Sequence, residues 1–252
     1  MDRAERERKA YDEDAVWEHS NRWHQRFSHV FESPNTLRHE RLFEDLQRSS
    51  APGKRVLELG CGDGENAARL LSHGADYVFG VDVSESFLER AQDRAVPGRL
   101  AFAMHDATEP FSEPFDLIVG RAILHHIDYR DVIGRLHDRT LQPGGMMIFM
   151  EPLGSNALIR LFTLLAPRAH TPDERSFRAG DLRWFREHMT GFELYPFNYA
   201  TLLAGIVSSR LLPSADNAML RAADRIDVWL ARHARWLEAQ FRQAVLVIRK
   251  PG

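Results

Sequence analysis

The sequence contains one cysteine, Cys61, in 252 residues, and this scarcity excludes an internal disulfide. No run approaches the ~18 apolar residues that a membrane-spanning helix needs. The N-terminus mixes acids and bases without an apolar stretch behind them, which is not the pattern of a secretory signal. A net charge of −3 gives no electrostatic footprint for nucleic acid. These absences predict a protein of a reducing compartment, with the cytoplasm as its expected location.

The composition is that of a chain with a large core. With 44% hydrophobic residues over 252 positions, one α/β domain with insertions is expected rather than two domains. No internal repeat or low-complexity segment interrupts it.

A glycine-rich loop follows the first apolar run of the core. Residues 56–59 form a short apolar segment with one acid, Glu58, and glycines then stand at positions 60, 62 and 64 before a helical pattern. Strand, tight loop and helix start are predicted, because glycine lets the backbone turn sharply and approach a ligand. The spacing is Gly-x-Gly-x-Gly, which differs from the Gly-x-Gly-x-x-Gly of dinucleotide-binding loops. An acid two residues before the loop favours a positively charged ligand.

The segment Glu58-Leu-Gly-Cys-Gly-Asp-Gly64 resembles the first motif of the class I S-adenosylmethionine (SAM) dependent methyltransferases. In that family the acid and the glycine loop hold the methionine end of SAM. Cys61 is explained by the need for a small side chain in a tight loop rather than by catalysis.

Three further segments follow in the order of the family's motifs. Asp82 ends an apolar strand about twenty residues beyond the loop, where a carboxylate can accept hydrogen bonds from ribose hydroxyls. By resemblance, Asp106 binds the adenine amino group beside Ala107, and the segment after the fourth strand passes beneath the sulfonium. The expected cofactor-binding residues are Glu58, Gly60, Cys61, Gly62, Gly64, Asp82, Val83, Asp106, Ala107, Arg121, Leu124 and His125.

Strand and helix patterns alternate five times up to residue 151, which predicts parallel pairing through crossovers. The expected fold is a Rossmann-like, doubly wound α/β sheet of seven strands, mostly parallel, with the last strand antiparallel as in the resembling family. The sixth and seventh strands are expected at 192–199 and 241–249. A helical N-terminal cap (1–48) precedes the core (49–252), with residues 1–14 as a solvated start.

Two helical insertions are expected at about 153–180 and 201–240, after strands five and six. The first is placed to form a lid over the acceptor. For the second, three interpretations stay open: a cap over an apolar acceptor, a homodimer surface, and peripheral membrane contact.

SAM supplies an activated methyl group, so the protein must bind the cofactor, align the acceptor and exclude water. A base is needed only for a protonated acceptor, and His125, His126 and Glu151 are the catalytic candidates, with His170, His19 and His24 as further bases. The predicted acceptor-binding residues are Trp17, His19, Trp23, Glu151 and His170. No acidic cluster follows the fourth strand, so no metal is expected.

The sequence therefore predicts a SAM-dependent methyltransferase acting on a hydrophobic small molecule such as a specialised metabolite or a lipid-like compound. An NAD-dependent oxidoreductase would share the sheet and Asp82, but not the glycine spacing or Glu58. A non-catalytic SAM-fold subunit that activates a partner is the second alternative. Methylation at oxygen, nitrogen or carbon is not distinguished.

Overall fold

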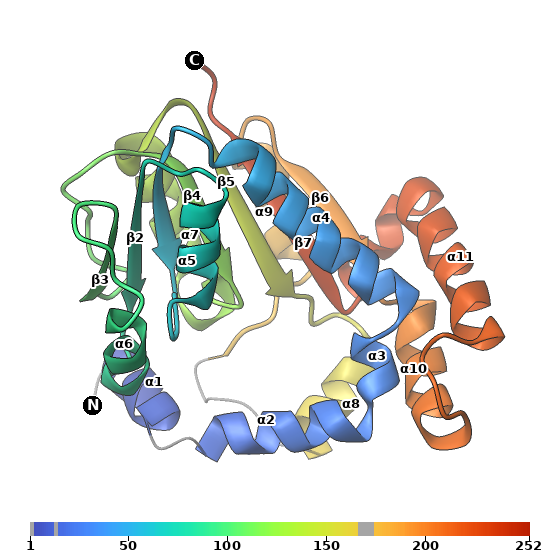
Figure 1. Ribbon diagram of the computed structural model, residues 1–252. Helices are drawn as coiled ribbons and strands as arrows, with labels where there is room; N and C mark the ends of the chain where they lie inside the picture. The colour runs from blue at the N-terminus through green and yellow to red at the C-terminus, as the bar shows by residue number, and fades with distance from the viewer. Residues whose placement is uncertain (1–2, 13–14, 166–173) are drawn as a thin grey trace.

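The computed structural model describes residues 3–12, 15–165 and 174–252, and contains a seven-stranded sheet between two layers of helices (Figure 1). The strand order is β3-β2-β1-β4-β5-β7-β6. The strands are β1 (Arg55–Leu59), β2 (Tyr77–Asp82), β3 (Leu100–Met104), β4 (Phe115–Arg121), β5 (Leu141–Pro152), β6 (Glu193–Phe197) and β7 (Gln243–Arg249).

Apolar residues on both faces of β1 explain why the sheet is covered twice. Leu57 and Leu59 join the core cluster formed with α7 (Tyr129–Arg135) and α9 (Ala179–His188). Val56 points to the other face and joins the cluster formed with α4 (Pro34–Ser50), α5 (Glu65–Ser72) and α6 (Glu85–Gln92). Strands buried on both faces are the mark of a parallel α/β sheet. The predicted doubly wound fold is confirmed.

The expected orientation of the last strand is also confirmed. β7 runs antiparallel to β5, with Met146 opposite Arg249, and β6 pairs with the other edge of β7. β5 begins at Leu141 and includes Pro143 and Gly144, which are residue types typical of a turn. The pairing with β4 is irregular between Phe115 and Leu117, and Gly144 has a φ of 75°, so the turn residues are absorbed into an irregular strand start.

The N-terminal segment is more ordered than a solvated start. It forms α1 (Arg3–Asp12), α2 (Ala15–Arg26) and α3 (Ser28–Phe31), and Glu7 of α1 is buried. Figure 1 shows α1 beside α6 at the end of the sheet where the parallel strands finish. The expectation of a solvated segment at 1–14 is therefore wrong for α1, because its polar side chains find partners in the core. Pro34 occupies the first turn of α4, where a missing N–H costs nothing.

The 200–240 insertion forms α10 (Ala200–Leu211), α11 (Ala218–His233) and a short 3₁₀ helix, η4 (Arg235–Gln240). Figure 1 shows α10 and α11 at the flank of the sheet that carries β6 and β7, far from α1. α10 packs against α3 and α11, and α11 also contacts α4.

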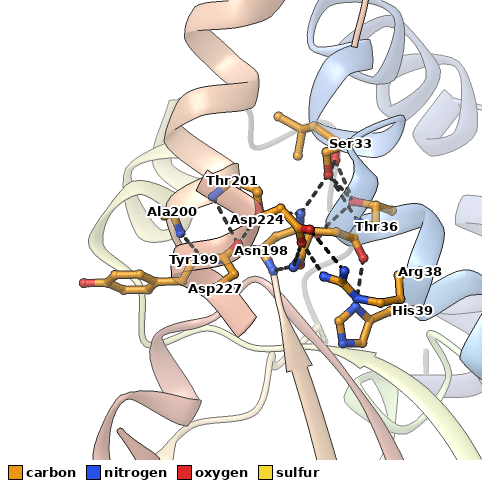
Figure 2. Close-up of polar contacts among 12 residues, drawn as sticks. Ser33, Thr36, Arg38, His39, Asn198, Tyr199, Ala200, Thr201, Asp224 and Asp227 are labelled. Atoms are coloured by element: carbon orange, nitrogen blue, oxygen red, sulfur yellow. Dashed lines mark hydrogen bonds and ion pairs between the residues drawn. The ribbon is translucent and has the colours of Figure 1, made fainter. Parts of the chain in front are cut away.

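Buried polar residues attach this insertion to the domain (Figure 2). Asn198 precedes α10 with a φ of 62°, and its side chain contacts Ser33 and Thr36 at the start of α4 as well as Thr201. Asp227 of α11 accepts hydrogen bonds from the backbone N–H groups of Tyr199, Ala200 and Thr201. One carboxylate thus satisfies the first N–H groups of α10, which a helix start leaves unpaired.

The insertion after β5 begins with α8 (Ala157–Leu165) and leads to α9. None of the described helices combines the length and the apolar character needed to cross a bilayer.

Candidate functional site

Gly60, Gly62 and Gly64 all have positive φ values, of 65°, 54° and 79°, as the sequence spacing predicts for a sharp turn. They are not equivalent. A Cβ at Gly64 would lie 2.6 Å from Phe102, so this glycine is needed for packing at the start of α5. A Cβ at Gly62 would meet nothing within 4 Å, because its Cα faces open space. Backbone that is bare toward open space can be approached closely by a ligand.

Asp82 fixes the loop to the end of β2. One of its oxygens accepts a hydrogen bond from Gly62 N at 2.9 Å and the other accepts one from Ser84 N at 2.9 Å. Ser84 is the residue whose hydroxyl caps α6, by accepting from Phe87 N. Asp82 is therefore not needed as the cap of α6.

Two adjoining cavities lie at the glycine loop and share Gly60, Gly62, Phe87 and Arg121. The first has a volume of about 310 Å³. Its wall includes the ends of β1, β2 and β3, the start of the segment after β4, and α1. The lining residues are Arg3, Glu7, Gly60, Gly62, Val81, Asp82, Val83, Phe87, His105, Asp106, Ala107, Arg121, Ala122, Ile123, His126 and Ile127. The second cavity, of about 950 Å³, includes Glu58, Cys61 and Asn66 in its wall.

Glu58 is a buried acid with an incomplete set of partners. Asn66 donates a hydrogen bond to Oε1 at 2.7 Å, whereas Oε2 has no hydrogen-bond partner among the described residues. Burial raises the pKa of Glu58 to about 8, and the hydrogen bond from Asn66 opposes the rise. A cationic group placed here would favour the charged carboxylate. Burial likewise raises the pKa of the Cys61 thiol, which makes this cysteine a poor nucleophile, as expected.

Arg3 and Glu7 of α1 bring charges into the first cavity. Arg3 Nη2 donates to both oxygens of Asp106, at 2.7 and 2.8 Å, and Nη1 reaches the carbonyl of His126. Glu7 lies one helical turn further on, with Oε2 3.1 Å from Nδ1 of His126. Burial lowers the pKa of His126, but the neighbouring Glu7 and Glu174 outweigh burial and raise it overall. α1 is thus tied to the cavity wall at two points.

Glu151 organises the segment after β4. It is fully buried, and Oε1 accepts hydrogen bonds from the backbone N–H groups of Ile123 and Leu124, each at 2.9 Å. Oε2 lies 2.8 Å from Nδ1 of His125. Ala122, just before this segment, has a φ of 53°, which is strained for a residue with a side chain. One carboxylate therefore fixes both the backbone turn and one imidazole.

The structure brings together most of the residues predicted to bind a cofactor. Glu58, Cys61 and the residues at 60, 62, 82, 83, 106, 107 and 121 line one or both cavities, as does His126. Gly64, Leu124, His125 and Glu151 support the walls from behind and are not lining residues. Arg121 also pairs with Glu40 of α4.

The structure describes only some of the residues predicted to bind the acceptor. Trp23 of α2 stacks on Phe27, which follows the helix, and does not line either cavity. The side chains of Trp17 and His19, and the whole of His170, lie outside the described residues. No lining residue comes from the described parts of 153–180 or from 201–240.

Arg3, Glu7, Phe87 and Ile123 line the first cavity without having been expected there. The i, i+4 spacing of Arg3 and Glu7 places both on one helix face, and this was the available signal. Their opposite charges are typical of a solvated helix face, and the sequence alone indicates no partner for either side chain.

His125, His126 and Glu174 form the one described group that could hold a metal ion, with potential ligand atoms within 4.8 Å of one another. Both histidines already have a carboxylate at Nδ1. The sequence-based expectation of no metal stays a prediction.

Comparison with known proteins agrees with this geometry. Residues 56–145 match the family described as "Methyltransferase domain". Over 101 residues the chain is 39% identical to a 27-O-demethylrifamycin SV methyltransferase of Amycolatopsis mediterranei, covering 38% of this chain and 37% of that protein. The chain spans less than half the length of the first curated relatives it matches.

Solved structures extend the likeness to the whole sheet. The N-methyltransferase NodS of Bradyrhizobium japonicum, in complex with S-adenosylhomocysteine (SAH), has a TM-score of 0.56 at 18% identity, over 87% of this chain and 89% of that one. Phosphoethanolamine N-methyltransferase 2 of Haemonchus contortus, in complex with SAM, has a TM-score of 0.55 at 21% identity, over 80% and 50%. The expected cofactor is confirmed at the level of the family. Residues 56–145 thus carry a methyltransferase domain, and the family model, the curated relatives and the shared fold together support a class I SAM-dependent methyltransferase.

Proposed function

We propose that this protein transfers a methyl group from SAM to a hydrophobic small-molecule acceptor. The observation that carries the proposal is the convergence of Gly62, Asp82 and Asp106 on one cavity. These residues span 44 positions of the sequence and share no helix or strand, so a common ligand is the economical explanation of their meeting.

The two cavities fit the two ends of the cofactor. Asp82 and Asp106 in the smaller cavity offer carboxylates to the ribose hydroxyls and the adenine amino group, with Ala107 beside the ring. Glu58 in the larger cavity offers its unpaired Oε2 to the ammonium of the methionine end. The positive charge of that ammonium would offset the cost of an ionised, buried carboxylate. Bound SAM supplies the activated methyl group, and the protein supplies orientation and a dry site.

His125 is the proposed base for an acceptor that carries a proton, and this role requires the acceptor to reach it behind the cavity wall. Its Nδ1 faces the Glu151 carboxylate, which fixes the ring and stabilises the imidazolium that forms when the other nitrogen, Nε2, takes a proton. In this proposal Glu151 positions His125 and does not touch the substrate. His126, paired with Glu7, remains the second candidate.

A hydrophobic acceptor is proposed because apolar side chains form part of the cavity wall and of the helix that follows β5. Ile123 and Ile127 lie beside His126 in the wall, and α8 is apolar apart from Arg160 and Thr163. Such walls exclude water and favour apolar ligands.

Isothermal titration calorimetry of the purified chain with SAM, SAH and NADH tests the proposed cofactor. Micromolar affinity for SAM and SAH without heat from NADH supports the proposal, and the opposite result favours an oxidoreductase. Transfer of a labelled methyl group should then be screened on apolar phenols, alcohols, amines and acids. Binding of SAM with turnover only in the presence of a partner protein would indicate an activator subunit.

The role of His125 is tested separately. His125→Asn should lower kcat at least ~100-fold for a protonated acceptor while the Kd for SAH changes less than about twofold. Glu151→Gln should also lower kcat while the Kd for SAH changes little, because it removes the carboxylate that orients the His125 ring. An unchanged kcat in His125→Asn would transfer the role to His126 or to no base at all.

A further inference from the structure

The outward face of α11 carries a stripe of apolar and aromatic residues. Met219, Ala222, Ile226, Trp229 and His233 follow one another at intervals of three and four, which places them on one side of the helix. Ile226 is 50% exposed and Trp229 is 59% exposed. Trp236 follows in η4 and is 81% exposed. Burial of large aromatic side chains is usually favourable, so two exposed tryptophans in one segment need an explanation.

This stripe is not required to hold the helix in place. The opposite face of α11 already buries Leu220, Ala223 and Asp227 against α10 and α4. Asn217 caps the helix by accepting a hydrogen bond from Leu220 N. Trp229 stacks only on His233 of its own helix, at 5.2 Å between ring centroids.

Positive charge borders the stripe. Arg225 and Arg232 stand four residues before and three residues after Trp229, and neither forms an ion pair with a described residue. Both acids of α11 are engaged elsewhere, since Asp224 pairs with Arg38 and Asp227 holds the start of α10. In η4, the single acid, Glu238, is buried beside Arg186. The outward face therefore presents arginine next to tryptophan without an exposed acid of its own.

We infer that the α11–η4 face docks on an anionic lipid bilayer. Tryptophan favours the boundary between headgroups and acyl chains, and arginine is attracted to anionic headgroups. A helix with an apolar stripe and a basic border is the form that lies in the plane of a bilayer surface. On a chain of net charge −3, a basic face also orients the molecule toward the membrane.

Charge favours the bilayer over a second copy of the chain. A two-fold symmetric dimer through this stripe would bring the Arg225 and Arg232 of each protomer close to those of the other. Like charges in an interface without acids are unfavourable. On α10, which packs beside α11, the apolar side chains of Leu203 and Leu211 are also exposed and would extend the contact with lipid. The inference concerns a surface away from the two cavities and does not rest on the proposed function.

Flotation of the full chain with vesicles tests the inference directly. We expect the protein to float with phosphatidylcholine vesicles that contain 30 mol% phosphatidylglycerol and to stay behind with pure phosphatidylcholine. Arg225→Gln/Arg232→Gln should weaken binding about tenfold or more. Trp229→Ser/Trp236→Ser should weaken it similarly and remove any blue shift of tryptophan emission on adding vesicles. All four side chains are exposed, so circular dichroism should show unchanged folding.

Lys54→Gln/Arg139→Gln is the matched control, because it removes two exposed basic charges that lie outside α11 and η4. Lys54 directly precedes β1, and Arg139 lies just before β5. It should bind vesicles as the parent does. Equal loss in this control, equal binding to both vesicle types, or no binding to either would overturn the inference. So would a concentration-dependent dimer in light scattering that Trp229→Ser/Trp236→Ser abolishes, since a second copy would then cover the stripe.

Discussion

Arg3 Nη2 lies 2.7 Å from Oδ1 and 2.8 Å from Oδ2 of Asp106, across 103 positions of the sequence. The same carboxylate accepts from Thr108 N at 2.9 Å. A carboxylate has about four acceptor positions, so Asp106 can hold Arg3 and still receive one more donor. In the proposed complex the adenine amino group takes that position, and α1 closes over it.

We expect Arg3→Gln to raise the dissociation rate of SAH about threefold to tenfold, because the tie between α1 and the cavity wall is lost. Stopped-flow displacement of SAH measures this rate. The pair is partly exposed, so thermal stability should hardly change. At high salt the pair is screened, so the parent protein should release SAH about as fast as the variant does. Tighter SAH binding in the variant would show instead that Arg3 competes with adenine.

Gly62→Ala should raise the Kd for SAM more than tenfold, because a methyl group would occupy space that the ligand approaches. Gly53→Ala is the matched control. Both glycines have positive φ and no atom within 4 Å of an added Cβ, so the cost of backbone strain, about 1 kcal/mol, should be alike. Calorimetric titration beside thermal unfolding separates the two effects. Equal loss of affinity in both variants would remove the glycine loop from the site.

Glu58→Gln should stabilise the ligand-free protein at pH 8 while weakening SAM binding about tenfold. The pKa of Glu58 in the folded state is raised to about 8, so the folded protein loses stability as pH rises from the unfolded-state value of 4.5 toward 8. Glutamine has no charge to bury. The melting temperature of the variant should exceed that of the parent by about 5 °C or more at pH 8 and by less than about 2 °C at pH 5. A gain independent of pH would contradict a buried carboxylate.

Asp227→Ala should lower the free energy of unfolding by about 2–4 kcal/mol, because several buried donors at the start of α10 lose their acceptor. Asp216→Ala, which removes an exposed acid paired with Arg221, should change it by less than about 0.5 kcal/mol. Urea unfolding gives both values. The Kd for SAH should stay unchanged in Asp227→Ala, since α10 and α11 contribute no lining residue to the cavities.

Incubation with EDTA, followed by gel filtration, should leave the rate of methyl transfer unchanged. Nδ1 of His125 and of His126 each faces a carboxylate. Among the described residues, Glu174 is the one further residue grouped with them as a potential metal ligand. Rate constants after adding back Mg²⁺, Mn²⁺ or Zn²⁺ complete the test. Recovery of activity with one of these ions would overturn the prediction and identify His125, His126 and Glu174 as ligands.

The sheet and the meeting of Gly60, Asp82 and Asp106 at one cavity were predictable because their signals are local. Each of the first three strands is largely apolar, and Gly60, Asp82 or Asp106 stands at its end or just after it. The sequence therefore indicates where each strand stops. Parallel pairing then brings the three ends to the same edge of the sheet. The alternation of helices and strands favours a single fold class, the parallel α/β sheet. The antiparallel last strand was expected from the resemblance rather than from the residues, and the order of the strands was not predicted.

Roles that depend on distant partners were not predictable. Glu151 ends β5 as expected of a residue at the ligand edge, but its hydrogen bonds to Ile123 and Leu124 join segments 27 or 28 residues apart. Arg3 looked solvated because Asp106, its partner, lies a hundred residues away. The place of α10 and α11 depends on Asn198 and Asp227, whose buried contacts leave no periodic mark in the sequence.

Glu151 has a consequence for how this scaffold tolerates change. One carboxylate sets the bend after β4 and the imidazole of His125, and it belongs to the sheet rather than to either insertion. In the proposed enzyme, the alignment of His125 would therefore depend first on the sheet. The described part of the segment after β5 adds a single backbone contact to this residue, from Arg175 N to the His125 carbonyl.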